Sequence, residues 1–312
     1  MNEVEHKKLH RLANKKMMGA DMIVQVLADE NVDTIFGYSG GAILPTYDAV
    51  FRYNNENKDA KNNQPMPLIV PANEQGAGFM ASGYARASGK VGVVMVTSGP
   101  GATNTVTPIR DCMADSIPIV VICGQVPTTA IGTDAFQEAP VSAIMGAVSK
   151  HIFLVTNPEL LESTVRSAFE LARTGRPGPV VIDVPKDIQN WEGAFKGSGK
   201  LPLIGYSNRL NAVMNNKLQE NSCQEFYSLL KNSKKPLIYA GGGVINANAT
   251  NELRDFASHY GIPVTTTLMA LGASDTTKPL SLHMLGMHGT ASANYAVEDC
   301  DFLITILSLI HI

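Results

Sequence analysis

The chain has 312 residues, of which 45% are hydrophobic and 17% charged, and its formal net charge is −3. This globular composition has room for roughly two domains, and the balance of 25 Lys and Arg against 28 Asp and Glu argues against a nucleic-acid partner. The four cysteines (Cys112, Cys123, Cys223 and Cys300) include no C-x-x-C pair, which argues against a disulfide framework or zinc site and favours a reducing, cytoplasmic location.

The first part of the chain alternates predicted helices and strands. Residues 1–17 carry both charge signs and lack the apolar core of a signal peptide, so they are predicted to be a tail. Residues 20–31 place their apolar side chains on one helical face, and residues 158–173 form a later helix that begins at a proline. Short runs rich in Val and Ile predict buried strands at 34–38, 67–70, 91–96, 118–123 and 179–184. The longest apolar run is far too short to cross a membrane.

A change of composition separates this first domain from a second one. Residues 191–216 are rich in Gly, Ser, Asn and Lys, which predicts a linker between a domain at 18–190 and another at 217–312. The second domain repeats the alternation, with a strand that ends at residue 240, then a helix and a further strand. The sequence therefore predicts an α/β fold with parallel sheets in both domains.

Glu74 stands where a predicted strand gives way to a helix of small residues, "EQGAGFMASGYARAS". The residues alone leave two interpretations open. A carboxylate near a helix N-terminus is stabilised by the helix dipole, so Glu74 is explained as a helix cap. Alternatively, the small residues leave space for a bound group that needs an acid at its edge.

Other motifs give weaker signals. The turn "TSGPGATN" at 97–104 lies between strand and helix, where backbone amides bind anions or polar rings. The turn "AGGGVIN" at 240–246 has the glycine spacing of a dinucleotide fingerprint, but Asn246 replaces the last small residue. His283 and His288 are wrongly spaced for two metal ligands on one helix face, and no metal site is predicted. A nicotinamide-dependent dehydrogenase and a non-catalytic binding module are therefore alternatives with little support.

Blocks taken together carry a resemblance that no single motif does. "NEQGAGFMASGYARASGKVGVVMVTSGPGATN", "GTDAFQE", "RTGRPGPVVIDVPKD" and "MLGMHGTASAN" occur in the order of the acetolactate synthase catalytic subunits, which are thiamine-diphosphate enzymes. The resemblance runs from about residue 18 to about residue 305. It implies a thiamine-diphosphate-binding (pyrimidine) domain with a parallel sheet, followed by a partial Rossmann-like, FAD-binding central domain.

The resemblance also implies roles for residues of the first domain. Glu74 matches the acid that contacts the aminopyrimidine ring of thiamine diphosphate, and the small residues at 76–81 would allow that cofactor to approach closely. Gly40 and Gly41 match a turn near the reacting carbon. Phe136 and Gln137 match a segment that lines the active site, with Gln137 as a catalytic residue beside Glu74 and Gly41. Lys186 matches a lysine near the substrate entrance.

For FAD the resemblance implies residues in both domains, whereas for Mg²⁺ it implies ligands in a further domain. The positions that hold FAD in the family are matched by Arg176, Gly241, Gly242, His288, Gly289 and Thr290. The diphosphate and its Mg²⁺ are expected to need a C-terminal domain with a Gly-Asp-Gly motif, and no Gly-Asp dipeptide occurs here. The 312-residue chain, which ends in an apolar tail, is therefore expected to be C-terminally truncated and inactive alone.

The implied reaction is the decarboxylating condensation of pyruvate with a second 2-oxo acid, pyruvate or 2-oxobutyrate, in valine and isoleucine biosynthesis. The implied partners are a second or further copies of the chain, as homodimer or tetramer, and a regulatory small subunit, without nucleic acid or membrane. The alternative within the superfamily is another carboligase or decarboxylase, such as an FAD-free catabolic acetolactate synthase. The chain departs from the family pattern at Ser39, Ala72, Asn73, Phe79 and Ser82, which leaves the preferred second 2-oxo acid open.

Overall fold

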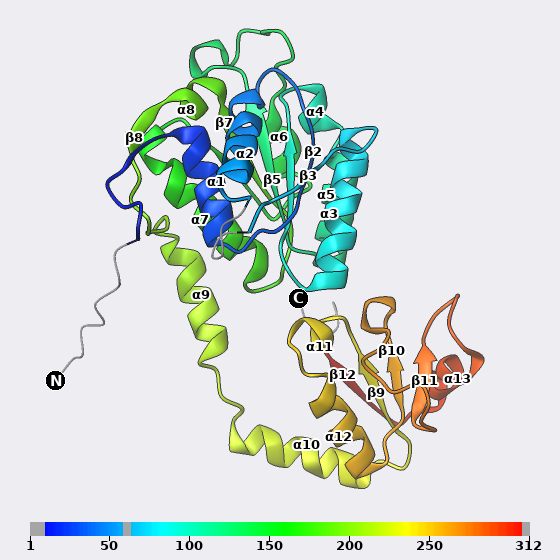
Figure 1. The fold of residues 1–312 in the computed structure, drawn as a ribbon. Helices are drawn as coiled ribbons and strands as arrows, with labels where there is room; N and C mark the ends of the chain where they lie inside the picture. Colours follow the sequence, from blue (N-terminus) through cyan, green and yellow to red (C-terminus); the bar gives the residue numbers. More distant parts are fainter. Residues whose placement is uncertain (1–9, 59–63, 308–312) are drawn as a thin grey trace, which may run out of the picture. The chain divides into compact units, whose positions relative to one another are not determined.

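The computed structural model describes residues 10–58 and 64–307, and it divides into two compact units, Met1–Met214 and Asn215–Ile312. Both units contain a parallel sheet with helices (Figure 1), so the predicted α/β fold with parallel sheets is confirmed. The apolar tail at residues 308–312 and the first nine residues lie outside the described part of the chain.

The N-terminal unit is built on a six-stranded sheet in the order β3-β2-β4-β5-β7-β6, and every neighbouring pair in it is parallel. Its strands are β2 (Ile35–Tyr38), β3 (Leu68–Ile69), β4 (Gly92–Val96), β5 (Ile119–Gln125), β6 (His151–Leu154) and β7 (Val180–Pro185). All residues of β4, β5 and β7 are buried, because helices cover both faces of the sheet. The strand β6 was not predicted, since "HIFL" is only partly buried and carries a weak apolar signal.

The helices of this unit form two layers. In one layer α1 contacts α2, α7 and α8, and in the other α3 contacts α5, as the arrangement in Figure 1 shows. The helices are α1 (Gly19–Asp29), α2 (Leu44–Glu56), α3 (Glu74–Ser88), α4 (Pro100–Thr103), α5 (Val106–Asp115), α6 (Val141–Gly146), α7 (Leu161–Arg173) and α8 (Lys186–Asn190). Single 3₁₀ turns stand at Thr128–Ala130 and Pro158–Leu160.

The order of strands creates a switch point between β2 and β4. The chain passes from β2 to β3 on one side of the sheet and then returns to place β4 on the other side of β2. In open parallel sheets a crevice forms outside the carboxyl ends of the two strands at such a point, and ligands bind there. The glycine turn after β2 and the turn after β4 therefore meet at the edge where a binding site is expected.

The predicted tail and linker need correction. Residues 16–18 form β1 (Lys16–Met18), which pairs antiparallel with β8 (Glu192–Ala194) inside the predicted linker. His10 lies 3.2 Å from Asp29 Oδ1, with its ring against Phe195. The rest of the predicted linker includes helix α9 (Ile204–Met214). The strands β1 and β8 carry no apolar periodicity, and they form because each supplies the backbone hydrogen bonds of the other.

The C-terminal unit has a four-stranded parallel sheet in the order β11-β10-β9-β12. Its strands are β9 (Pro236–Ala240), β10 (Val264–Thr266), β11 (Ser281–Met284) and β12 (Phe302–Ile306). Its helices are α10 (Glu220–Asn232), α11 (Gly243–Asn246), α12 (Thr250–Tyr260) and α13 (Ala291–Asp299), with a 3₁₀ turn at Leu268–Ala270. Its core contains Ile238, Leu253 and Val264. The strand order reverses between β9 and β12, which puts a second switch point beside the glycine turn that follows β9.

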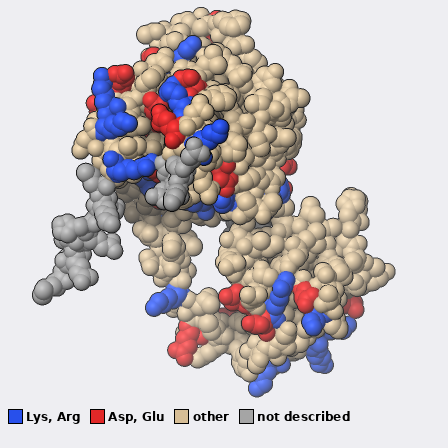
Figure 2. Space-filling view, in the orientation of Figure 1, with Lys and Arg blue, Asp and Glu red and all other residues tan. Residues whose placement is uncertain are grey.

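On the face that Figure 2 shows, acidic and basic side chains are interspersed, without an area of one sign. Among the helices of the described residues, none has the length and apolar character that a membrane crossing requires.

Candidate active site

The turn that follows β2 is fixed by direct contact with the turn that follows β4. A Cβ atom added to Gly40 would lie 2.5 Å from the Thr97 side chain, so only glycine fits this close approach. The backbone N–H of Ala42 donates to Thr97 Oγ1 at 3.3 Å. Gly41, in contrast, has no atom within 4 Å of the place where its Cβ would stand. The turn is thus held at both sides of Gly41 and open at Gly41 itself.

Glu74 is the first residue of α3, but it is not the cap of that helix. The cap is Asn73, whose side-chain oxygen accepts a hydrogen bond of 2.8 Å from the backbone N–H of Gly76. The side chain of Glu74 turns instead toward the neighbouring loop, where its Oε2 accepts a hydrogen bond of 3.0 Å from Asn104 Nδ2. This geometry removes the cap interpretation of Glu74, because another residue performs that task.

The second oxygen of Glu74 is available to a ligand. Glu74 is only 9% exposed, and its Oε1 lies 3.6 Å from the position of a Cβ on Gly101. Within residues 10–58 and 64–307, Oε1 has no hydrogen-bond partner. A buried carboxylate stabilised by a helix dipole and bonded through one oxygen leaves the other to meet a polar group.

Tyr47 of α2 lies within the electrostatic field of this acid. Burial raises the pKa of the Tyr47 hydroxyl, and the charge of Glu74 raises it further. The hydroxyl donates to the Met95 carbonyl at 3.0 Å, and a Cβ on Gly37 would overlap it. Tyr47 therefore stays a neutral hydrogen-bond donor that joins α2 to β4 underneath the site.

The small residues of α3 do not open space for a ligand, which corrects the prediction made from them. A Cβ on Gly78 would lie 2.4 Å from Pro108 of α5, and one on Gly76 would lie 3.4 Å from Pro71. Ala77 and Ala81 are fully buried. Gly78 thus brings α3 close to α5, and the glycine that borders the Glu74 carboxylate is Gly101 instead.

The segment that contains Phe136 and Gln137 lies over the turn after β4. Gly99 has φ +54°, and a Cβ on it would stand 2.3 Å from the Gln137 carbonyl oxygen. Gln137 itself adopts φ 58°. Phe136 is 88% exposed, so the chain brings the backbone of this segment to the turn after β4 but leaves the Phe136 ring in solvent.

Lys186 and Arg176 lie at opposite ends of strand β7, and thus at the carboxyl and amino edges of the sheet, respectively. Lys186 is partly buried and begins α8 directly after β7, so it belongs to the carboxyl edge with Glu74. Arg176 precedes β7 and therefore lies at the amino edge. Its guanidinium donates to the Ser116 hydroxyl at 2.9 Å and to the carbonyls of Met113 and Ala114 at 2.9 and 3.0 Å, which caps the C-terminus of α5. The structure does not bring Arg176 together with Glu74.

In the C-terminal unit the glycine turn lies against the end of β12. The N–H of Gly241 donates to the Ile306 carbonyl at 2.8 Å, and a Cβ on Gly242 would stand 2.7 Å from Met269 Cβ. At the adjoining end of β10, the buried hydroxyls of Thr266 and Thr267 have no hydrogen-bond partner among the described residues. Buried polar atoms without partners at a switch point favour a polar ligand.

The segment at 288–290 forms a tight turn that begins α13. A Cβ on Gly289 would stand 2.2 Å from the Met284 carbonyl oxygen. Thr290 Oγ1 donates to the Leu282 carbonyl at 2.6 Å and accepts from the N–H of Ala293 at 3.2 Å, so Thr290 is the helix cap. His288 is exposed and follows β11 at the same carboxyl edge as Gly241 and Gly242.

The site contains residues that the sequence did not single out. Asn104 was noted only as a mismatch to the dinucleotide fingerprint, yet it is the partner of Glu74. Thr97 and Gln189 contact the turn at Gly40–Ala42. Polar side chains directly after a buried strand were the signal for Thr97, whereas the contact of Gln189 joins positions too distant in sequence for any pattern to reveal.

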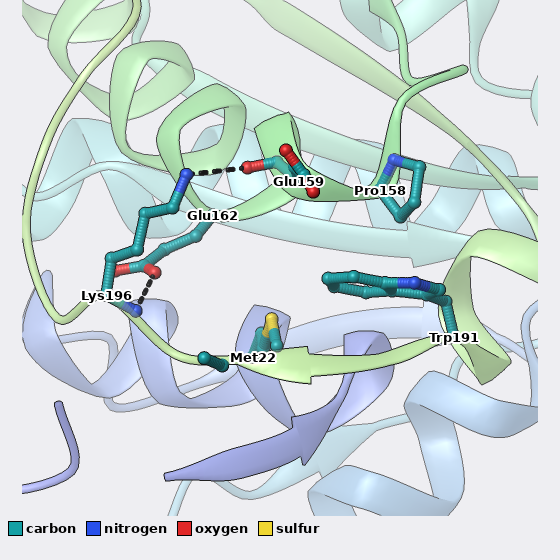
Figure 3. A pocket seen from close by; sticks show the side chains of 7 residues that line it. Met22, Pro158, Glu159, Glu162, Trp191 and Lys196 are labelled. Atoms are coloured by element: carbon teal, nitrogen blue, oxygen red, sulfur yellow. Dashed lines mark hydrogen bonds between the residues drawn. The ribbon is translucent and has the colours of Figure 1, made fainter. Parts of the chain in front are cut away.

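A cavity of about 230 Å³ elsewhere on the N-terminal unit is not the candidate site. Its lining includes Met22, Trp191 and Lys196 (Figure 3), and it contains none of the residues around Glu74. The Lys196 ammonium is bonded to the Glu159 carbonyl at 3.3 Å, and the Lys196 N–H to Glu162 Oε2 at 2.8 Å. Lys196 and Glu162 are thus engaged within the chain.

Comparison with known protein families finds two matching domain models. Residues 17–144 match the N-terminal TPP binding domain of thiamine pyrophosphate enzymes. Residues 223–307 match the central domain of the same enzymes. Glu74, Asn104 and Gly41 lie in the first match, and Gly241 and His288 in the second.

Curated relatives match nearly the whole chain. The acetolactate synthase large subunit of Corynebacterium glutamicum is 46% identical over 294 residues, which are 94% of this chain and 44% of the relative. The mitochondrial acetolactate synthase catalytic subunit of Saccharomyces cerevisiae is 46% identical over 93% of this chain and 41% of its own length. The chloroplastic acetolactate synthase of Arabidopsis thaliana is 44% identical over 92% and 40%. The chain thus spans less than half the length of these relatives.

Proposed function

Because this chain belongs to the thiamine pyrophosphate enzyme family, we propose that it provides the pyrimidine-binding and central domains of an acetolactate synthase catalytic subunit. The proposed reaction is the decarboxylating condensation of pyruvate with a second 2-oxo acid, pyruvate or 2-oxobutyrate, in branched-chain amino-acid biosynthesis. Similarity to acetolactate synthases over at least 92% of the chain supports this activity. The observation that carries it is the buried carboxylate of Glu74 at the switch point, which accepts a hydrogen bond through Oε2 and leaves Oε1 for a ligand.

The residues around Glu74 fit the aminopyrimidine ring of thiamine diphosphate. A ring nitrogen needs a carboxyl group with one oxygen free to bond to it. Glu74 is a mostly buried residue whose hydrogen bond from Asn104 uses Oε2, which leaves Oε1 for the ring. The cofactor, when bound, supplies the electron sink for making and breaking carbon–carbon bonds next to a carbonyl. The task left to the protein is to position reactants and control protons.

Each residue of the site has a proposed part in that task. Asn104 holds Oε2, so that Oε1 is the atom of Glu74 that exchanges a proton with the ring. Gly41 leaves an open surface where the carbonyl of the 2-oxo acid has room beside the fixed turn. Gln137 reaches the same edge through its backbone, and Lys186 provides a positive charge that attracts the carboxylate of the substrate.

The other cofactors and partners belong to the same proposal. We propose that FAD binds at the C-terminal unit, where the unpartnered hydroxyls of Thr266 and Thr267 lie beside Gly241 and Gly242, and that His288 contributes. The contribution of Arg176 to FAD binding is part of the proposal. Mg²⁺ is proposed to accompany the diphosphate, without ligands from this chain. A homodimeric or tetrameric assembly, a regulatory small subunit and a cytoplasmic location complete it.

The test is the substitution Glu74→Gln, which keeps the shape of the side chain and replaces the ionisable carboxyl group with an amide that cannot act as an acid or base. We would use a chimera in which residues 18–305 replace the matching segment of the Corynebacterium glutamicum relative. Turnover of pyruvate to acetolactate should fall about 10²–10⁴-fold, the range for a positioned acid–base group. Isotope exchange at the reactive carbon of bound thiamine diphosphate should slow in parallel.

Glu30→Gln serves as the control, since Glu30 is a largely buried glutamate at the amino edge, where it pairs with Arg173. It should leave turnover within about twofold, because the site is at the other edge of the sheet. If Glu74→Gln turns over and exchanges as the unmodified chimera does, the proposed role of Glu74 is wrong.

A further inference from the structure

Gln189, near the end of α8, is fully buried although its side chain is polar. Its Nε2 donates to the Ala42 carbonyl at 2.8 Å and to the Val184 carbonyl at 2.9 Å. Its Oε1 accepts from Thr46 Oγ1 at 2.9 Å. Both donors and the acceptor oxygen of the amide are therefore used, and they join α8, the end of β7, the start of α2 and the turn after β2.

The bond to Ala42 completes the restraint of the turn that contains Gly41. The peptide N–H of Ala42 is bonded to Thr97 on one side, and its carbonyl is bonded to Gln189 on the other. The backbone of Ala42 also packs on Gly124, where a Cβ would stand 2.6 Å from its carbonyl. Ala42 thus has no freedom to rotate unless one of these contacts breaks.

The helix that carries Gln189 is itself fixed. A Cβ on Gly19, at the start of α1, would lie 2.2 Å from the Ile188 carbonyl oxygen, and the Ile188 side chain is buried. Gln189 is therefore anchored by the packing of α8 against α1 and β7, and it holds the turn in a fixed place relative to these elements.

We propose that Gln189 is a positioning residue, which fixes the Ala42 carbonyl and thereby holds Gly41 in place at the carboxyl ends of β2 and β4. It contacts neither Glu74 nor the open space at Gly41, and it acts through the turn. The catalytic consequence rests on the proposed function above, whereas the structural consequence does not. Packing alone does not require a polar side chain here, because an apolar residue of similar size would fill the same volume. We therefore attribute the role of Gln189 to the hydrogen bonds of its amide group.

The structural consequence is tested in the 312-residue chain by hydrogen exchange of single backbone amides. In Gln189→Met the amides of Ala42 and Ile43 should exchange at least about tenfold faster, while those in the middle of β5 keep their rates. Gln25→Met is the matched control, because Gln25 is also buried, at 7% exposure, but donates to Asp29 instead. Unchanged exchange at Ala42 and Ile43, or an equal rise in the control, would overturn the proposal.

Thr46→Val decides the matter if Gln189→Met does not fold. It removes the Thr46 hydroxyl that donates to Gln189 Oε1 and leaves the bond to Ala42 less well oriented. Exchange at Ala42 should then rise about two- to fivefold. A rate equal to that of the unmodified chain would count against Gln189 as the residue that fixes the turn.

The catalytic consequence is tested in the chimera. Gln189→Met should lower kcat about 10- to 100-fold, as displaced reactants do, whereas isotope exchange at the bound cofactor, which depends on Glu74, should stay within about twofold. If kcat is unchanged while hydrogen exchange at the Ala42 amide rises, Gln189 fixes the turn but has no effect on catalysis. The proposal that Gln189 positions the turn for the reaction then fails. If Glu74→Gln also has no effect, the proposed function fails instead, so the two failures are distinct.

Discussion

Asn104 Nδ2 lies 3.0 Å from Glu74 Oε2, which joins the acid at the start of α3 to the loop that follows α4. Hydrogen bonds to a charged group are worth roughly 1.5–3 kcal/mol, and this one also decides which oxygen of Glu74 is free. The pair therefore sets both the direction and the environment of the carboxylate.

Replacement of Asn104 should impair the reaction more than the fold. In the chimera, Asn104→Ala is expected to lower turnover about 10-fold, because Glu74 loses the partner that orients it. Asn104→Asp should lower it further, since a second carboxylate, at the exposed position 104, would then face the buried carboxylate of Glu74. Turnover and the thermal midpoint would be measured together.

Asn73→Ala is the control for Asn104, because it removes the cap of the same helix without touching the Glu74 carboxylate. It should cost about 1 kcal/mol of unfolding free energy and leave turnover nearly unchanged. A larger effect of Asn73→Ala than of Asn104→Ala on turnover would contradict our assignment of these two residues.

Gly40 and Gly41 should respond in opposite ways to the same added methyl group. Gly40→Ala is expected to destabilise the chain by about 1–3 kcal/mol, because the new Cβ would overlap Thr97. Gly41→Ala should leave the unfolding free energy within about 0.5 kcal/mol of the original, since its Cβ meets no atom, but should alter KM and kcat for pyruvate in the chimera. Denaturant unfolding and steady-state kinetics check both. Equal stability of the two variants would show that the close approach at Gly40 is not as described.

The α/β fold could be predicted from the sequence because its main strands and helices have regular hydrophobic patterns. The buried strands β4, β5 and β7 are rich in Val and Ile, and the apolar face of α1 is regular. The strands β1 and β8 have three residues each and no such signal, so their pairing could not be read from residues 1–17 and 191–216. Short elements of that kind depend on contacts made elsewhere in the chain.

The candidate site was predictable only in part, for a similar reason. Glu74 and Gly41 lie at strand ends that the pattern already revealed, so topology brings them to one edge. The packing of Gly78 on Pro108 shows the limit, because a small residue signals close approach without saying which neighbour approaches. The bond between Gln189 and Ala42 spans 147 positions and depends on the finished fold.

Arg176 allows the two roles assigned to it to be separated. Arg176→Ala should lower the unfolding free energy by about 1–3 kcal/mol, because α5 loses three hydrogen bonds at its C-terminus. If Arg176 also contacts FAD, flavin affinity should fall one to two decades, measured by titration of flavin fluorescence. Arg173→Ala, which breaks the ion pair between the exposed Arg173 side chain and the largely buried Glu30, should change stability by about 1 kcal/mol and leave flavin binding intact. Retained flavin in a destabilised Arg176→Ala would reduce Arg176 to a helix cap.

Asp183 of β7 should make the stability of the chain depend on pH in an unusual direction. Burial raises the pKa of its carboxyl from 3.8 to about 7, although Gln125 Nε2 donates to its Oδ2 at 2.9 Å. Its Oδ1 has no partner among the described residues. Between about pH 4 and pH 7 the folded chain therefore binds this proton more tightly than the unfolded chain, so stability falls as the pH rises through that window.

The variant Asp183→Asn removes the ionisation and with it this dependence. The unfolding free energy of Asp183→Asn should rise relative to that of the unmodified chain as the pH goes from 5 to 8. This difference should grow by at most about 3 kcal/mol, because each unit of pKa shift is worth 1.36 kcal/mol. Asp187→Asn is the control, because hydrogen bonds from Thr128 outweigh burial and lower the pKa of Asp187. The stabilising effect of Asp187 is lost only as the pH falls below about 4, so its replacement should leave the slope between pH 5 and pH 8 unchanged. Denaturant unfolding at both pH values measures each difference, and equal slopes for Asp183→Asn and the unmodified chain would show that Asp183 is ionised throughout this range.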